Sequence, residues 1–81
     1  MTLYIRNLSP SATADDLSLL FHQFGKVRRV HLAANGAYHA AFVTMNSRDE
    51  ADSARHFLNG KDLKGQPLEI VNAPEFRHSA N

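Results

Sequence analysis

Two helix-like patterns, each with an apolar stripe on one side only, limit most strongly what this chain of 81 residues can fold into. They cover about residues 14–24 and 48–58. Their stripes recur at helical spacing and consist of Leu17, Leu20, Phe21 and Phe24 in the first and Ala51, Ala54 and Leu58 in the second. A helix with one apolar stripe covers only one neighbouring surface. Both helices are therefore expected to pack against the same side of the remaining structure.

The ends of both predicted helices carry recognisable signals. Thr13 and Asp16 have the spacing of a capping box, although Asp is shorter than the preferred Glu. Ser47 and Glu50 predict a full capping box at the start of the second helix. Gly25 is well placed to end the first helix in a left-handed conformation.

The rest of the chain is dominated by β-rich runs. Strands are predicted at residues 3–7, 27–33, 37–45 and 68–71. The pair Asn35-Gly36 is a strong signal for a tight hairpin between the second and third strands. The order strand-helix-strand-strand-helix-strand is typical of an α+β, ferredoxin-like domain. We therefore expect a four-stranded antiparallel sheet with two helices on one face and the other face open.

Alternation along the first strand predicts which of its side chains lie on the open face. Leu3 and Ile5 point one way, and Tyr4 and Arg6 point the other. An unpaired arginine is very rarely buried in a core of this size. Tyr4 is therefore expected on the open face together with Arg6.

The third predicted strand is less easily oriented. Both of its faces are largely apolar, with Tyr38 and Phe42 on one of them. Alternation alone leaves open whether this face belongs to the core or to a binding surface. On the second strand, Arg29 and His31 share one face, and their polarity places that face in solvent.

Composition excludes several classes of function. The chain has 43% hydrophobic and 21% charged residues, which is typical of a globular domain. It has no cysteine, so disulfides and thiolate metal sites are excluded. The histidines lack metal-site spacing, and no nucleophile, phosphate loop or carboxylate pair suggests an enzyme. No membrane-spanning or signal segment is evident, and the expected location is cytoplasmic, or nuclear for a fragment of a eukaryotic protein.

At this point the sequence resembles a known family, the RNA recognition motif (RRM), over about residues 2–73. Residues 3–8 resemble the family's hexamer, and residues 38–45 fill the window of its octamer. Further landmarks lie in the expected order at Phe24-Gly25, Asn59-Gly60, Leu63, Gly65 and Leu68. The resemblance, which extends to small stand-alone bacterial RRM proteins, implies an RNA recognition motif domain at 1–73. It leaves a flexible tail at 74–81.

The resemblance also implies a ligand and a set of binding residues. The ligand is single-stranded RNA, with single-stranded DNA as a further candidate, and no cofactor is implied. Family members stack bases on three exposed aromatic rings, of which this chain keeps Tyr4 and Phe42 and has Ala40 at the third position. Tyr38 could partly replace the missing ring. Phe76 could either stack on a base or block the face.

The positively charged residues expected at the interface are few. Arg6, Arg29 and Arg77 are expected to contact phosphates or base edges, and His31 shares the same face. One missing stacking platform costs about 1–3 kcal/mol. The expected affinity is therefore on the order of micromolar or weaker.

A second reading is a protein-interaction or weak homodimerisation module of the same fold. Some relatives with degenerate octamers bind peptides through the helical face, using Arg-x-Phe in the turn after the second helix. That turn reads Lys61-Asp62-Leu63 in this chain and does not match. Self-association through the helices, with Leu19 or Phe57 exposed, remains an alternative.

Overall fold

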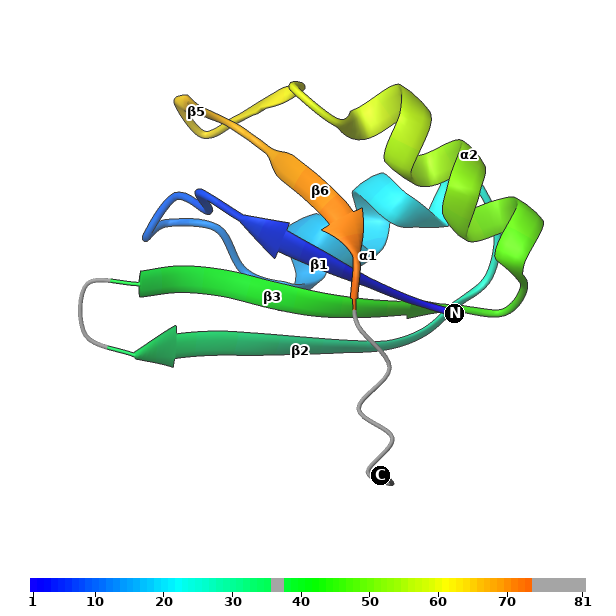
Figure 1. Cartoon of the computed structure of the whole chain (residues 1–81). Coiled ribbons are helices and arrows are strands. Elements are labelled where there is room, and N and C mark those ends of the chain that lie inside the picture. Colours follow the sequence, from blue (N-terminus) through cyan, green and yellow to red (C-terminus); the bar gives the residue numbers. More distant parts are fainter. Residues whose placement is uncertain (36–37, 74–81) are drawn as a thin grey trace.

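The computed structural model describes residues 1–35 and 38–73, with side chains at 1–33 and 39–73. The chain forms a four-stranded antiparallel sheet with two helices packed on one of its faces (Figure 1). In spatial order the strands are β2 (Val27–Asn35), β3 (Tyr38–Met45), β1 (Thr2–Arg6) and β6 (Glu69–Asn72). The helices are α1 (Ala14–His22) and α2 (Arg48–Leu58), and a small hairpin of β4 (Asp62–Leu63) and β5 (Gln66–Pro67) precedes β6. The predicted ferredoxin-like arrangement is confirmed.

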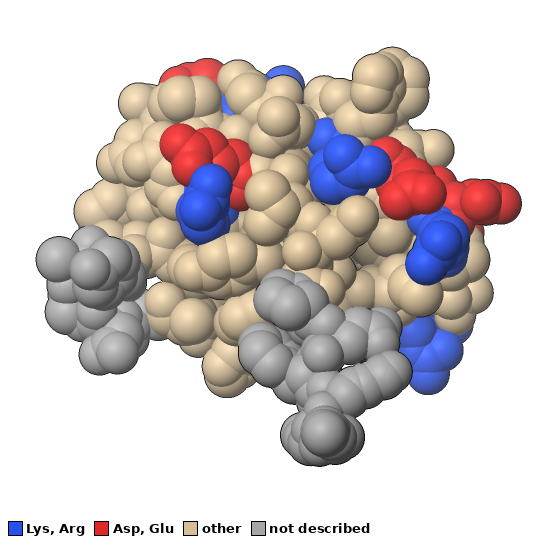
Figure 2. All heavy atoms as spheres, viewed as in Figure 1, with Lys and Arg blue, Asp and Glu red and all other residues tan. Residues whose placement is uncertain are grey.

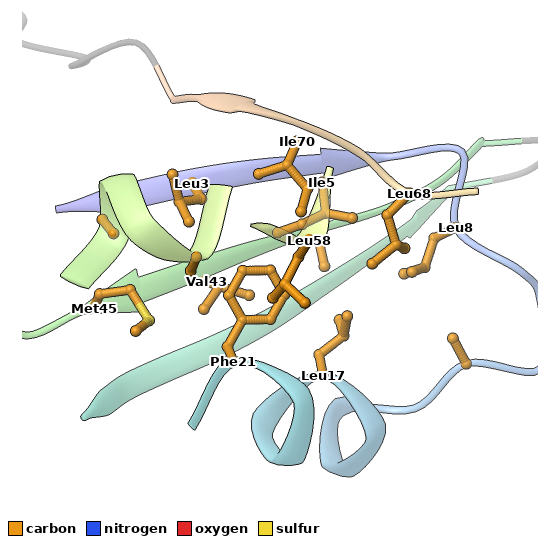
Figure 3. Packing of buried hydrophobic residues seen from close by; sticks show 14 residues of the cluster. Leu3, Ile5, Leu8, Leu17, Phe21, Val43, Met45, Leu58, Leu68 and Ile70 are labelled. Carbon is orange, nitrogen blue, oxygen red and sulfur yellow. The ribbon is translucent and has the colours of Figure 1, made fainter. Parts of the chain in front are cut away.

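The core lies between the sheet and the two helices (Figure 3). Leu3 and Ile5 of β1 are fully buried, as the alternation of that strand predicts. From the helices, Phe21 enters the core between the elements, while Ala51 and Ala54 are small enough to bring α2 close to the sheet. The single apolar stripes of the helices thus settle which face of the sheet is covered.

The two helix starts differ from the prediction in an instructive way. In α1 the short Asp completes the capping box, because Thr13 N–H donates to Asp16 Oδ2 at 3.0 Å and Asp16 N–H donates to Thr13 Oγ1 at 3.1 Å. In α2, Glu50 N–H donates to Ser47 Oγ at 3.3 Å, but the return bond is not made. The prediction of a full box in α2 is therefore wrong.

The loop between α1 and β2 explains why Glu50 does not complete the capping box of α2. The Glu50 side chain lies against Gly25, where a Cβ atom would overlap its carboxyl group. Glu50 Oε1 is buried and has no hydrogen-bond partner among the described residues.

The helix α1 ends at His22, two residues before the predicted end. Gly25, which follows in the loop, has a φ of +153°.

The strands agree with the predicted ones to within two residues at each end. The longest extension is in β2, which continues to Asn35 and pairs there with Tyr38, as expected for a tight hairpin. Residue 37, the predicted start of the third strand, lies outside the described residues. The hairpin of β4 and β5 was not predicted, because strands of two residues are too short to show a period.

Candidate nucleic-acid interface

The sheet face opposite the helices is the candidate interface, and we call it the open face. Residues paired across antiparallel strands share a face, so the register defines its members. From β2 to β6 these are Arg29, His31, Ala33, Ala40, Phe42, Thr44, Thr2, Tyr4, Arg6, Glu69 and Val71. Within residues 1–35 and 38–73, no helix or strand covers this face (Figure 1).

Aromatic rings from three strands meet at the centre of the open face. Tyr4 on β1 lies opposite Phe42 on β3, with 5.0 Å between the ring centroids and 32° between the planes. His31 on β2 lies on the other side of Phe42, at 6.4 Å and 33°. Tyr4 and Phe42 are half-buried and His31 is exposed. The three side chains thus form a row of tilted rings across the sheet.

Ala40 lies on the same face, where the family pattern would have a ring. Its partner on β2 is Ala33, so neither strand supplies a large side chain there. A hollow of about 580 Å³ opens over Ala40 and is bounded by Tyr4 and Arg6 on one side. Ala40 is only 7% exposed, which is low for a residue on an uncovered sheet face.

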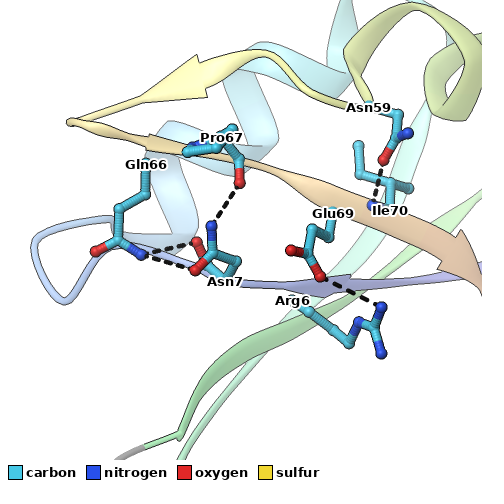
Figure 4. A network of polar contacts seen from close by, with 7 residues as sticks. All are labelled: Arg6, Asn7, Asn59, Gln66, Pro67, Glu69 and Ile70. Atoms are coloured by element: carbon cyan, nitrogen blue, oxygen red, sulfur yellow. Dashed lines mark hydrogen bonds and ion pairs between the residues drawn. The ribbon is translucent and has the colours of Figure 1, made fainter.

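The cations of the open face are only partly free. Arg6 pairs with Glu69 across β1 and β6, with 3.3 Å from Nη2 to Oε1 (Figure 4). Both side chains are about half exposed, at 53% and 54%. Arg29 is exposed opposite Thr44. Figure 2, drawn in the view of Figure 1, shows basic side chains next to acidic ones rather than one continuous basic area.

Sequence reasoning missed Glu69 as a member of this face. The signal was available in its own strand, since Leu68 and Ile70 are apolar and buried while Glu69 and Val71 alternate with them. The same alternation that placed Arg6 outward would have placed Glu69 beside it.

Asn7, at the end of β1, joins the open face to the β4–β5 hairpin. Its side-chain amide donates to the backbone oxygen of Pro67 at 2.8 Å (Figure 4). Gln66 Nε2 donates in turn to the backbone and side-chain oxygens of Asn7, at 3.0 and 3.2 Å. Asn7 has a φ of 59°, a left-handed conformation that asparagine tolerates well.

Three of the predicted site residues cannot be placed. The side chain of Tyr38, and Phe76 and Arg77 entirely, lie outside the described residues. Among the side chains that are described, no group of three or more histidine, aspartate or glutamate residues could hold a metal ion. In the same part of the chain, no helix is long and apolar enough to cross a membrane.

Comparison with known proteins decides the family. The sequence profile of the RNA recognition motif matches residues 3–69. The chain belongs to the RNA recognition motif family. Human heterogeneous nuclear ribonucleoprotein Q is 41% identical over 71 residues, which are 88% of this chain and 11% of that protein. This RRM chain therefore spans about a tenth of that relative's length.

Other relatives of this RRM are nearer to it in size. A protein of a Nostoc strain named "Putative RNA-binding protein RbpD" is 38% identical over 77 residues, covering 90% of this chain and 82% of that protein. Among solved structures, the third RRM of Pes4 superimposes with a TM-score of 0.86 at 25% identity, covering 98% of each chain. The RNA-binding protein PG1 gives 0.84 at 25% identity, with 93% of this chain and 95% of that one covered.

Proposed function

We propose that residues 1–73 form a single-stranded RNA-binding module whose bases stack on Tyr4 and Phe42. The observation that carries the proposal is the row of aromatic rings across the open face, with 5.0 Å between Tyr4 and Phe42. Rings with accessible faces on a sheet are the usual platform for unstacked bases. His31 extends the row toward β2, and Arg29 and Arg6 supply positive charge on either side.

The affinity of the module is modest, on the order of micromolar or weaker. Two stacking rings are available where the family pattern has three, and each is worth about 1–3 kcal/mol per base. Single-stranded DNA can stack on the same rings, so a weaker complex with DNA is part of the proposal. The names of the relatives, a nuclear ribonucleoprotein and bacterial RNA-binding proteins, support RNA as the ligand and a cytoplasmic or nuclear location.

An NMR titration with a pool of randomised seven-nucleotide RNAs tests ligand, face and affinity together. Amide shifts should concentrate on β1, β3 and β2. Phe42→Ala should weaken binding by about 5- to 150-fold while the fold is kept, because it removes one stacking platform.

Phe57→Ala is the matched control for this variant. Phe57 is a phenylalanine too, 66% exposed, but it lies on α2, away from the open face. It should bind RNA as the wild type does. Shift changes confined to the helices, or equal losses in both variants, would contradict stacking on the open face.

A second candidate function is protein binding or self-association through the helices. It is favoured by two large exposed apolar side chains, Leu19 on α1 at 71% and Phe57 on α2 at 66%. Phe57 stacks on the partly buried Phe24, with 5.8 Å between centroids and 10° between planes, so it is held in place. Sedimentation velocity over a wide concentration range should then show a dimer that Phe57→Ser abolishes. A monomer at all concentrations excludes self-association.

A further inference from the structure

A hollow is lined by Ala40 of the open face. Ala40 forms its floor and is 7% exposed, although no described element lies over it. The other apolar or aromatic lining residues are Tyr4 on the sheet and Leu8 and Pro10 in the loop after β1. Polar side chains of Arg6, Asn7, His39 and Gln66 line the same hollow. A recess with a small apolar floor and walls of this kind suits a flat apolar group with polar edges.

Gln66 lines the hollow and has a side-chain oxygen that accepts no hydrogen bond from the described residues. The Gln66 amide nitrogen donates to two oxygens of Asn7, at 3.0 Å to the backbone oxygen and 3.2 Å to the side-chain oxygen. Because a backbone oxygen only accepts, the atom facing it must be the nitrogen of Gln66. Gln66 Oε1 therefore points away from Asn7 (Figure 4) and accepts no hydrogen bond from the described residues.

We propose that the hollow holds one base of the bound RNA and that Gln66 Oε1 accepts a hydrogen bond from its amino group. The site then prefers cytosine to uracil. This inference rests on the proposed RNA-binding function and adds to it the base that this position selects. The two pyrimidines have the same shape but opposite polarity at positions 3 and 4 of the ring: cytosine has an acceptor at N3 and an amino donor at position 4, and uracil has an N3–H donor and an oxygen acceptor. The inference applies to a base whose position 4 faces Gln66 Oε1. A uracil oxygen would face Gln66 Oε1 with no hydrogen between them.

The expected preference is small but measurable. A neutral hydrogen bond contributes about 0.5–1.5 kcal/mol net, which corresponds to an affinity ratio of about 2- to 12-fold. Adenine also carries an amino donor, but cytosine and uracil are the matched pair because they share one ring size and differ only at positions 3 and 4.

The test uses a seven-nucleotide oligouridine and the same RNA with one cytosine at each position in turn. One position should bind about 2- to 12-fold more tightly with cytosine. The base at that position should give intermolecular NOEs to the Ala40 methyl group. Gln66→Met keeps the length of the side chain and removes the acceptor. The ratio of the affinities for cytosine and uracil should therefore fall to about one. Gln23→Met, the same change at the exposed end of α1, should leave it intact.

Ala40→Phe provides an independent variant that does not touch the bonds of Gln66 to Asn7. It fills the hollow and supplies the missing ring, so affinity for oligouridine should hold or rise while the cytosine preference disappears. A wild-type ratio of one at every position, with shifts still on the open face, overturns the inference and leaves the proposed function standing. A preference that survives both Gln66→Met and Ala40→Phe also overturns it. Absence of any RNA-induced shift overturns the proposed function, and the inference with it.

Discussion

Glu69 places a negative charge on the open face beside its best-placed cation. Its carboxylate lies 3.3 Å from the Arg6 guanidinium, and both groups are about half exposed. An exposed ion pair of this kind is worth only about 0.2–1 kcal/mol. In the proposed complex, an RNA phosphate that binds Arg6 would have to displace the carboxylate at the cost of that energy.

Glu69→Gln should raise RNA affinity by up to about 5-fold, because Arg6 no longer has to leave its partner. The slope of log affinity against log salt should become steeper by about 0.7, the value for one more phosphate contact on a single strand. Asp49→Asn, the same charge change on the exposed first turn of α2, is the control. An equal gain in both variants would mean that only net charge matters. Fluorescence anisotropy at several salt concentrations measures both quantities.

Gly25 shows how one residue can restrict another that is distant in sequence. Its φ of +153° is unfavourable for other residues, and a Cβ atom there would overlap the Glu50 carboxyl group. Gly60 also has a positive φ, of +87°, but a Cβ atom there would contact nothing.

Gly25→Ala should therefore lower the free energy of unfolding by about 0.5–1.5 kcal/mol more than Gly60→Ala, because the flexible end of the Glu50 side chain must leave its preferred conformation to make room. Adding Glu50→Ala to Gly25→Ala should restore the part of the unfolding free energy that was lost through crowding. The part lost through backbone strain should remain lost. Urea denaturation measures each difference. If the double variant gains nothing over Gly25→Ala, the overlap with Glu50 is not the cause.

At the level of elements, the capping box of α1 links a helix start to the stability of the fold. The hydrogen bond from Thr13 N–H lowers the pKa of Asp16 below its ordinary value of 3.8, and Lys64 of the hairpin turn, at 3.6 Å, lowers it further. The folded state thus favours the ionised carboxylate. Stability from this group is fully present above about pH 3.8 and is lost as the pH falls through the lower folded pKa.

Acidification from about pH 6 to about pH 2 should therefore destabilise the wild type more than Asp16→Asn, which has no carboxylate to protonate. Asp15→Asn is the matched control, because the Asp15 carboxylate lies outside the capping box. It should lose as much stability as the wild type. Thermal unfolding followed by circular dichroism at each pH gives the comparison. Equal losses in wild type and Asp16→Asn would contradict the linkage.

At the level of the whole molecule, charge is nearly balanced. The chain has nine basic and eight acidic residues, and acidic and basic side chains lie next to one another in the view of the open face (Figure 2). Binding that depended on electrostatic attraction would need a larger cationic surface. In the proposed complex with RNA, stacking on aromatic rings is therefore expected to supply more of the affinity than phosphate contacts do.

RNA binding should accordingly depend only weakly on salt. With about three phosphate contacts, the slope of log affinity against log salt should be about −2. Affinities measured between about 50 and 200 mM salt test this. A slope near −6 would mean that phosphate contacts supply most of the affinity for RNA. It would contradict the proposal that stacking on Tyr4 and Phe42 is the main contribution.

Much of the fold could be predicted from local patterns. The stripe of α2 and the alternation of β1 each repeat within a few residues, so they report directly on which side of an element is buried. The tight pairing of Asn35 with Tyr38 follows from turn chemistry in the same way. The prediction of a full Ser47–Glu50 capping box was wrong because a capping signal takes account only of residues within one helix. In the folded chain the Glu50 side chain instead packs against Gly25, which lies outside that helix.

The candidate site was predictable in its members and less so in its contacts. By itself, the sequence determined the order of elements, the covered and open faces of the sheet, and Tyr4 as an outward-facing ring. Only the tertiary structure decided that Arg6 pairs with Glu69, that Gln66 is tied to Asn7, and that a hollow opens over Ala40. The physical reason is that periodicity is a property of one element. Partners across strands depend on register and loop closure, which arise only when the whole sheet is assembled.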